Sequence, residues 1–235
     1  MKYVFFIISK ITEFYFNVFF NVLIEKSLLW RVSFHKCKKN KIELQDAKVE
    51  HTKIFFSGEN NTVSIKGLCH HCCIEIYGSG HIVNICARTK LHFVRIIVRG
   101  KNCNIDIGDG TTIGSAYMVC MGNSNSIVIG RECMFAENVE IWSSDTHPIF
   151  TKDSETIINP SKPVSIGNHV WLGKYVIVLK GVTIDDDAVV GMRSLVTRNI
   201  EGNSLNVGIP TMQIRRNINW KRDFISNCKQ SKIGS

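Results

Sequence analysis

The chain has 235 residues, enough for one sizeable hydrophobic core, and its 44% hydrophobic and 21% charged residues are ordinary for a soluble globular protein. The formal net charge of +9 is unusual. It indicates an anionic partner, which could be a membrane surface, an acidic glycan, a cofactor phosphate or a nucleic acid, unless the excess only keeps the protein soluble. No nucleic-acid-binding motif accompanies the charge, so nucleic acid ranks last, and no GxGxxG or Walker loop indicates an NAD or ATP site.

Residues 1–41 differ from the rest of the chain and predict a hydrophobic, amphipathic helix over about 1–30, followed by a basic linker. Polar residues recur every four positions: Glu13, Asn17, Asn21 and Glu25. This spacing draws one narrow polar stripe along a helix. It also interrupts the run of about 18 apolar residues that a transmembrane span needs. The helix either lies in a membrane interface or packs on the remaining protein or on a neighbouring subunit. We expect a cytoplasmic protein, peripheral at the inner face of the membrane in the first case.

From residue 42 to residue 129 a loose repeat of 20 to 22 residues appears. A glycine opens each repeat, and an apolar pair follows at the fifth and seventh positions after it. The glycines are Gly58, Gly78, Gly100 and Gly122, and the pairs are Val63/Ile65, Val83/Ile85, Ile105/Ile107 and Ile127/Ile129. Three hexads make a triangular coil of about 18 residues, so each repeat is a coil with a small insertion at a corner, where glycine tolerates a positive φ. A solenoid is therefore expected to begin near residue 42, with an independent β-domain as the alternative.

Nine cysteines, an odd number, without the spacing of a secreted disulfide scaffold, indicate reduced thiols in a cytosolic protein. One segment collects three of them with two histidines: Cys69, His70, His71, Cys72 and Cys73. Structural zinc usually needs a second ligand pair, and adjacent residues of a strand point to opposite faces, so these five side chains cannot converge. We expect the thiols to behave as small core residues and predict no metal site.

Between Ile166 and Val196 the period tightens to six. A branched aliphatic residue stands at every sixth position: Ile166, Leu172, Val178, Ile184, Val190 and Val196. A small or β-branched residue follows each of the first five after four positions: Val170, Val176, Val182, Ala188 and Ser194. A period of six fits a short strand, a turn and another short strand, stacked as coils that share one core. From Ile141 to Ile166 is 25 residues, not a multiple of six, so residues 142–165 are expected to leave the wall as a protruding loop.

These hexads, with the segments SSDTHPIF, VVGMRSLVTRNI and VGIPTMQIRR, resemble the hexapeptide-repeat acyltransferases, in particular the bacterial O-acetyltransferases of capsule and lipopolysaccharide, including those that modify polysialic acid. The match spans about 105–216. The resemblance implies a mainly β fold, a left-handed parallel β-helix over 42–216, although parallel crossovers are nearly always right-handed elsewhere. It also implies a homotrimer with sites between subunits. Residues 217–235 are expected to form a short helix and a frayed tail.

The resemblance assigns the catalytic base to His147, in the motif DTHP at the start of the loop. Histidine titrates near neutral pH and suits this work, although taken alone His147 fits a turn cap better. Trp171 is expected to face outward at a coil corner, covered by a neighbouring subunit or, as the resemblance implies, positioning the thioester or acceptor. Asp145 either orients His147 or closes an Asx-turn. No glycine elbow surrounds Ser143 or Ser144, which favours direct transfer over an acyl-enzyme.

The resemblance also implies acetyl-CoA as the donor, held by the backbone and the basic residues of the last coils. Carried over to this sequence, the cofactor-binding positions are Gly173, Lys174, Met192, Thr197, Arg198 and Arg215. Met212 replaces a basic residue that often meets the cofactor in the family, and Arg215 or Arg216 is expected to compensate.

We therefore predict an acetyl-CoA-dependent O-acetyltransferase acting on a bacterial surface polysaccharide or its lipid-linked precursor, acidic in view of the positive charge. Two alternatives stay open. One is a small-molecule acetyltransferase of the same fold, of the streptogramin or small-sugar type. The other is a non-catalytic β-helix scaffold.

Overall fold

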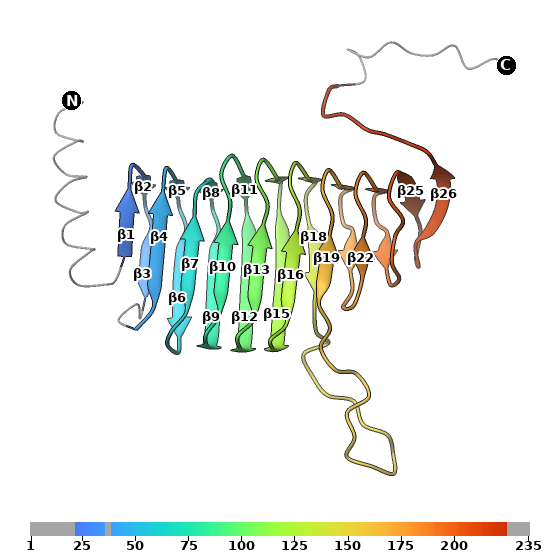
Figure 1. Cartoon of the computed structure of the whole chain (residues 1–235), viewed down its shortest axis with the longest axis horizontal. Coiled ribbons are helices and arrows are strands. Elements are labelled where there is room, and N and C mark those ends of the chain that lie inside the picture. The colour runs from blue at the N-terminus through green and yellow to red at the C-terminus, as the bar shows by residue number, and fades with distance from the viewer. Residues whose placement is uncertain (1–21, 36–38, 225–235) are drawn as a thin grey trace.

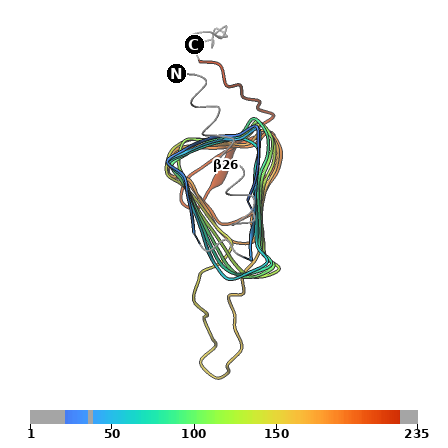
Figure 2. The same ribbon diagram turned by 90° about the vertical axis from the view of Figure 1, so that its left-hand side faces the viewer.

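The computed structural model describes residues 22–35 and 39–224, and these residues form a parallel β-solenoid without a helix. Each coil contributes one strand to each of three sheets, here called A, B and C in the order in which the chain passes through them. Figure 1 shows the coils stacked along one axis, and Figure 2, which looks along that axis, shows their triangular outline. The prediction of a mainly β solenoid is confirmed.

Sheet A contains β1 (Val22–Glu25), β4 (Lys41–Gln45), β7 (Thr62–Ile65), β10 (Ile82–Ile85), β13 (Asn104–Ile107), β16 (Ser126–Ile129), β19 (Val164–Ile166) and β22 (Thr183–Ile184). Sheet B contains β2 (Leu28–Trp30), β5 (Lys48–Glu50), β8 (Leu68–His70), β11 (Lys90–His92), β14 (Thr112–Ile113), β17 (Met134–Phe135), β20 (Trp171–Leu172), β23 (Val189–Val190), β25 (Ser204–Val207) and β26 (Met212–Arg216). Sheet C contains β3 (Ser33–His35), β6 (Lys53–Ser57), β9 (Cys73–Ser79), β12 (Val94–Lys101), β15 (Ala116–Asn123), β18 (Val139–Trp142), β21 (Ile177–Val178) and β24 (Leu195–Val196). Strand pairing is parallel, except that β26 returns antiparallel to β25.

The core is a set of apolar columns that run along the axis. In sheet A, Val63, Val83, Ile105 and Ile127 occupy equivalent positions of neighbouring strands, and all four are fully buried. The residues that open each hexad of the last coils, from Ile166 to Val196, are buried in the same way. Each coil alone would expose this face, so the stacking that buries it also fixes the register. The apolar pairs and hexads predicted from the sequence are thus confirmed as the inward-facing residues.

A glycine column lies where sheet C ends and the chain turns back to sheet A. Gly78, Gly100 and Gly122 are paired in register, and with Gly58 they have φ between +112° and +145°. A Cβ on Gly100 would lie 1.9 Å from the carbonyl oxygen of Gly122. Glycine is therefore required both by the backbone conformation and by the close approach of the next coil. The predicted corner role of these glycines is confirmed.

The solenoid begins earlier than the sequence indicated. Residues 22–30, expected to end a helix, instead form β1 and β2, and β3 follows within the expected linker. Strand β1 pairs with β4 over four residues, so the first coil covers an edge of sheet A that would otherwise be open. The expected helix over 1–21 lies outside the described residues. None of the described residues belongs to a helix that could cross a membrane.

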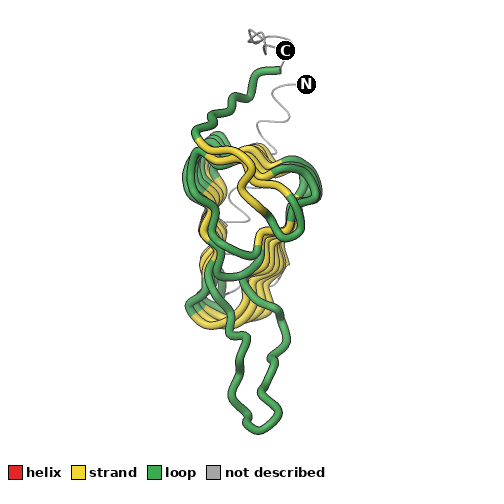
Figure 3. Tube along the Cα trace, turned by 90° about the vertical axis from the view of Figure 1, so that its right-hand side faces the viewer, coloured by secondary structure: helices red, strands yellow, loops and turns green. Residues whose placement is uncertain are grey.

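The C-terminal end also differs from the expectation of a short helix. Residues 217–224 run as irregular chain, and the rest of the expected helix and tail lies outside the described residues. After β26 the chain turns back over the coils, as Figures 1 and 3 show. We call residues 217–224 the C-terminal strap. The loop between β18 and β19, residues 143–163, projects from the opposite side of the solenoid (Figure 1).

Candidate active site

The protruding loop is anchored at its root by buried polar contacts. Ser143 is fully buried, and its Oγ accepts a hydrogen bond from Asn125 Nδ2 at 2.8 Å. Ser144 Oγ accepts from Ser161 Oγ at 3.0 Å, which joins the outgoing and returning arms of the loop. Both hydroxyls therefore serve in anchoring the loop, so neither is placed as a free nucleophile.

Asp145 closes the base of the loop by an ion pair. Its carboxylate accepts hydrogen bonds from Lys180 Nζ and from Asn159 Nδ2, the latter at 2.9 Å. The hydrogen bond from Lys180 is the main cause that holds the pKa of Asp145 below its usual value. The described contacts of this carboxylate do not include His147. The sequence left two roles open for Asp145, orienting His147 and closing an Asx-turn. The structure shows neither role for the carboxylate, which instead links the loop to the next coil.

His147 lies just beyond this base and is exposed. Its main chain is fixed, because its N–H donates to the Asp145 carbonyl at 2.8 Å and its own carbonyl accepts from Asn159 Nδ2 at 2.9 Å. No described residue forms a hydrogen bond with its imidazole ring. The arrangement holds a free imidazole on a fixed backbone, which suits a group that must accept a proton from a bound ligand.

Trp171 opens β20 and faces outward, with 37% of its surface exposed. Its cover comes from the same chain, because the ring of Trp220, in the C-terminal strap, lies with its centroid 5.9 Å away. Trp220 itself is only 6% exposed. It stacks on His169 at 4.1 Å, nearly parallel, and donates its indole N–H to the His169 carbonyl at 2.7 Å. The outward position predicted for Trp171 is confirmed, and the covering residue is one that the sequence analysis missed.

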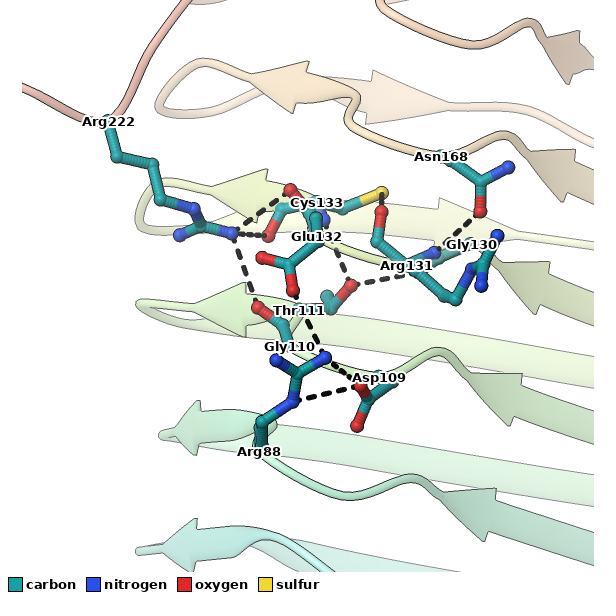
Figure 4. A network of polar contacts seen from close by, with 10 residues as sticks. All are labelled: Arg88, Asp109, Gly110, Thr111, Gly130, Arg131, Glu132, Cys133, Asn168 and Arg222. Carbon is teal, nitrogen blue, oxygen red and sulfur yellow. Dashed lines mark hydrogen bonds and ion pairs between the residues drawn. The ribbon is translucent and has the colours of Figure 1, made fainter.

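Arg222 fastens the C-terminal strap to two further coils. Its guanidinium donates to the carbonyl oxygens of Gly110, Glu132 and Cys133, and to Thr112 Oγ1. Figure 4 shows the guanidinium reaching the three carbonyl oxygens from the strap. Because the acceptors belong to different coils, the strap links neighbouring turns of the solenoid beside Trp171. In the sequence the strap is marked only by a tryptophan and an arginine in a segment that is poor in apolar residues.

Five of the six positions carried over for acetyl-CoA fall on two corners, and Arg215 lies on β26. Gly173 and Lys174 follow β20 at the corner between sheets B and C, and Met192 lies at the same corner of the next coil. A Cβ on Gly173 would lie 2.7 Å from the Met192 nitrogen, so the close stacking requires glycine here. Lys174 Nζ pairs with Glu137 at 2.7 Å, and this hydrogen bond raises the pKa of Lys174. Met192 is 66% exposed.

Thr197 and Arg198 follow β24 at the corner between sheets C and A, the corner from which the loop with His147 projects. Arg215 is exposed on β26, opposite Leu205. One chain therefore groups Gly173, Lys174 and Met192 but does not bring them to His147. Trp171 lies at a third corner, between sheets A and B. A site that contains all of these residues needs more than one copy of the chain.

Cys69 and Cys72 are buried in the core, as expected for small apolar residues, whereas His70 and His71 face outward. Within the described ranges, no group of three histidine, cysteine or acidic side chains could hold a metal ion.

Residues 163–198 match the family model described as bacterial transferase hexapeptide (six repeats). The polysialic acid O-acetyltransferase of Escherichia coli O1:K1 / APEC is 35% identical over 126 residues, which are 54% of this chain and 41% of the relative. That of Neisseria meningitidis is 32% identical over 131 residues, 55% of this chain and 60% of the relative. The crystal structure of the polysialic acid O-acetyltransferase OatWY superposes with a TM-score of 0.73 at 26% identity, over 86% of this chain and 93% of that chain. The chain spans about half the length of the two curated relatives.

Proposed function

Since the chain is a member of the hexapeptide-repeat transferase family, we propose that it is an acetyl-CoA-dependent O-acetyltransferase of a bacterial surface polysaccharide. The observation that carries the proposal is the free imidazole of His147 on the anchored root of the loop. The names of the relatives support acetyl transfer to a hydroxyl and an acidic glycan as the acceptor, and the net charge of +9 suits such a polymer.

His147 acts as the general base of a direct transfer. Its neutral imidazole accepts the proton of the acceptor hydroxyl as that oxygen attacks the thioester carbonyl of acetyl-CoA. The carbon–sulfur bond then breaks, the acetyl group stays on the acceptor oxygen, and the imidazolium gives its proton to the departing thiolate. Direct transfer is favoured because Ser143 and Ser144 are buried and engaged in hydrogen bonds.

The donor is proposed to lie along the corner between sheets B and C, against Gly173, Lys174 and Met192. Gly173 allows the two coils to stack closely at this corner, and the exposed Met192 side chain offers an apolar surface beside it. Thr197, Arg198 and Arg215 are kept as proposed contacts to the phosphates. We propose a homotrimer, because a neighbouring copy can bring its own loop and His147 to this corner.

A cytoplasmic location forms part of the proposal. The described cysteines are free thiols, as is usual in a reducing compartment. The proposed contact of residues 1–21 with the inner face of the membrane also remains a proposal, and deletion of these residues tests it by membrane sedimentation. A truncated protein that still sediments with membranes would contradict it.

The experiment is thiol release from acetyl-CoA by the wild type and by His147→Ala, offered polysialic acid, neutral polysaccharides and small sugars. Loss of the base is expected to slow transfer by about 10²- to 10⁴-fold. His35→Ala, a change at an exposed histidine on β3, is the matched control and should retain full turnover. Full activity of His147→Ala would overturn the mechanism. Turnover on small sugars alone would replace the polysaccharide acceptor by a small molecule.

A further inference from the structure

A second group of chemically active side chains lies on the upstream coils, away from the candidate active site. It consists of His51, His70, His71, His92 and Phe93, which we call the histidine cluster. His70 and His92 are paired in register at the ends of β8 and β11. His51, His71 and Phe93 are the first residues after successive strands of sheet B, and all three have φ near +50°. The repeat of the coil therefore places one ring above another.

The rings form a continuous stack. His51 and His71 are parallel with centroids 4.4 Å apart, and Phe93 continues the stack at 5.0 Å from His71. His70 meets His71 edge to face at 4.4 Å and His92 at 5.5 Å. Phe93 is 59% exposed and His71 is exposed as well. Because the faces of the stacked rings cover one another, the edges that carry the nitrogen atoms are left to meet a ligand.

The imidazole nitrogens of the cluster are almost unused inside the protein. No described residue forms a hydrogen bond with the rings of His51, His71 or His92. His70 has one distant ionic neighbour, since its Nε2 lies 3.9 Å from Glu50, whose carboxylate also pairs with Lys48 at 3.2 Å. A neutral imidazole offers one N–H donor and one acceptor nitrogen, and a protonated one offers two donors, so the open ring edges can bind the carboxylate and hydroxyl groups of a ligand.

The charges around the cluster favour a ligand with negative charge. Lys48 and Lys90 flank it on β5 and β11, and Glu50 is the acidic group that faces it. Loss of hydration and the neighbouring His70 and His51 lower the pKa of His71, and loss of hydration, His70 and Lys90 lower that of His92. A bound carboxylate would oppose these effects by stabilising the protonated rings.

The cluster shares sheet B with Trp171, one residue of the candidate site. The strand register puts Lys90, Thr112, Met134 and Trp171 at equivalent outward positions of four successive strands of sheet B. Three strand spacings of about 4.8 Å separate Lys90 from Trp171, or about 14 Å along the axis. Arg222 of the C-terminal strap binds Thr112 between these two places, so a polymer that meets both passes beside the strap. A small acceptor at Trp171 is too short to meet both.

We propose that the histidine cluster is a docking site for a carboxylated polysaccharide, which it binds at a segment other than the one that receives the acetyl group. The inference rests on the proposed function in taking this polymer to be the acceptor. The cluster holds the polysaccharide along sheet B. This raises the effective concentration of the polysaccharide's hydroxyl groups at the transfer site. Protonation of the rings strengthens the binding, so binding is tighter at acidic than at alkaline pH.

Binding of fluorescently labelled long-chain polysialic acid to full-length protein carrying His147→Ala tests the proposal, because this background measures binding without turnover. We expect binding at pH 6 to be at least about fivefold tighter than at pH 8. The triple variant His51→Asn, His70→Gln, His71→Asn should weaken binding at pH 6 by about tenfold or more and should lose most of the pH dependence. Asparagine is used at the corner positions because it tolerates the positive φ there. His35→Gln is the control and should bind as the parent does.

An unchanged thermal unfolding temperature would show that the triple variant is folded. Binding of that folded variant as tight as that of the parent at pH 6 would overturn the docking site, as would equal binding of neutral dextran. With His147 restored, the same triple variant should raise the KM for long polysialic acid and leave the KM for a sialic acid dimer unchanged. If the triple variant loses binding but the wild type acetylates no polymer, the docking site stands and only the proposed function is overturned.

Discussion

The C-terminal strap depends on one aromatic side chain, so Trp220→Ala should release it. Trp220 is 6% exposed, and an aromatic ring of this kind buries about 200 Å², which contributes about 5 kcal/mol. Its indole hydrogen bond adds about 1 kcal/mol, and the four bonds of Arg222, on partly exposed acceptors, add about 1 kcal/mol each. Ordering the five residues 218–222 costs about 5–10 kcal/mol. Because the stabilisation by these contacts and the cost of ordering the strap nearly cancel, loss of the indole shifts the strap to the released state.

Hydrogen–deuterium exchange of the peptide 217–224 measures this release. The amide of Ile218, which donates to the Asn203 carbonyl at 3.0 Å, should lose its protection in Trp220→Ala. The strands of the solenoid core should exchange as in the wild type, since the variant does not touch the inward-facing columns. Asp223→Ala changes an exposed residue of the same segment and is the control. Unchanged exchange of the strap in Trp220→Ala would refute the reasoning that the indole anchors it.

Two further predictions concern the corners of the coil. Gly100→Ala should destabilise the fold by about 2–4 kcal/mol, because its Cβ would lie 1.9 Å from the Gly122 carbonyl oxygen at a φ of +112°. Gly114→Ala, with its nearest contact at 3.3 Å, should cost less than about 1 kcal/mol in the same denaturant unfolding assay, and equal losses would contradict the argument. The ion pair with Lys180 lowers the folded-state pKa of Asp145. It therefore stabilises the loop base fully at pH values above the unfolded-state pKa, which is about 4, and this stabilisation is lost as the pH falls through the lowered folded-state pKa. The protection of the loop amides, taken as exchange relative to the intrinsic rate at each pH, should therefore fall at acidic pH in the wild type, and Lys180→Met should remove this acid-dependent step. A step that persists in the variant would exclude the ion pair as its cause.

The inward face of the solenoid was predictable because burial constrains it at every coil. Ile105, Ile127 and Val164 repeat the same environment, and the chain marks each with a branched aliphatic residue. The position of the loop was predictable for the same reason, since the break in the period after Ile141 is a break in that environment. A local pattern could carry this information because each coil contacts mainly its neighbours.

The first coil was not predictable from its own residues. The polar residues at helical spacing, which ended at Glu25, led to the prediction of a helix up to residue 30, and over residues 22–30 that prediction was wrong. Strand β2 pairs with β5, some 20 residues further along the chain. Context of this kind overrides local propensity, since strand preference depends on the partner that is available.

By itself the sequence determined the repeating coil, its inward columns, its glycine corner and the place where the loop leaves the wall, because short-range periodicity encodes burial. Only the tertiary structure decided what covers Trp171, since the contact with Trp220 joins residues far apart in the chain. It also decided that His147 and Trp171 lie at different corners of one chain, and that histidines from successive coils meet in one stack. Which residues share a corner depends on the number of residues in every intervening turn. That relation becomes visible only once the coils are stacked.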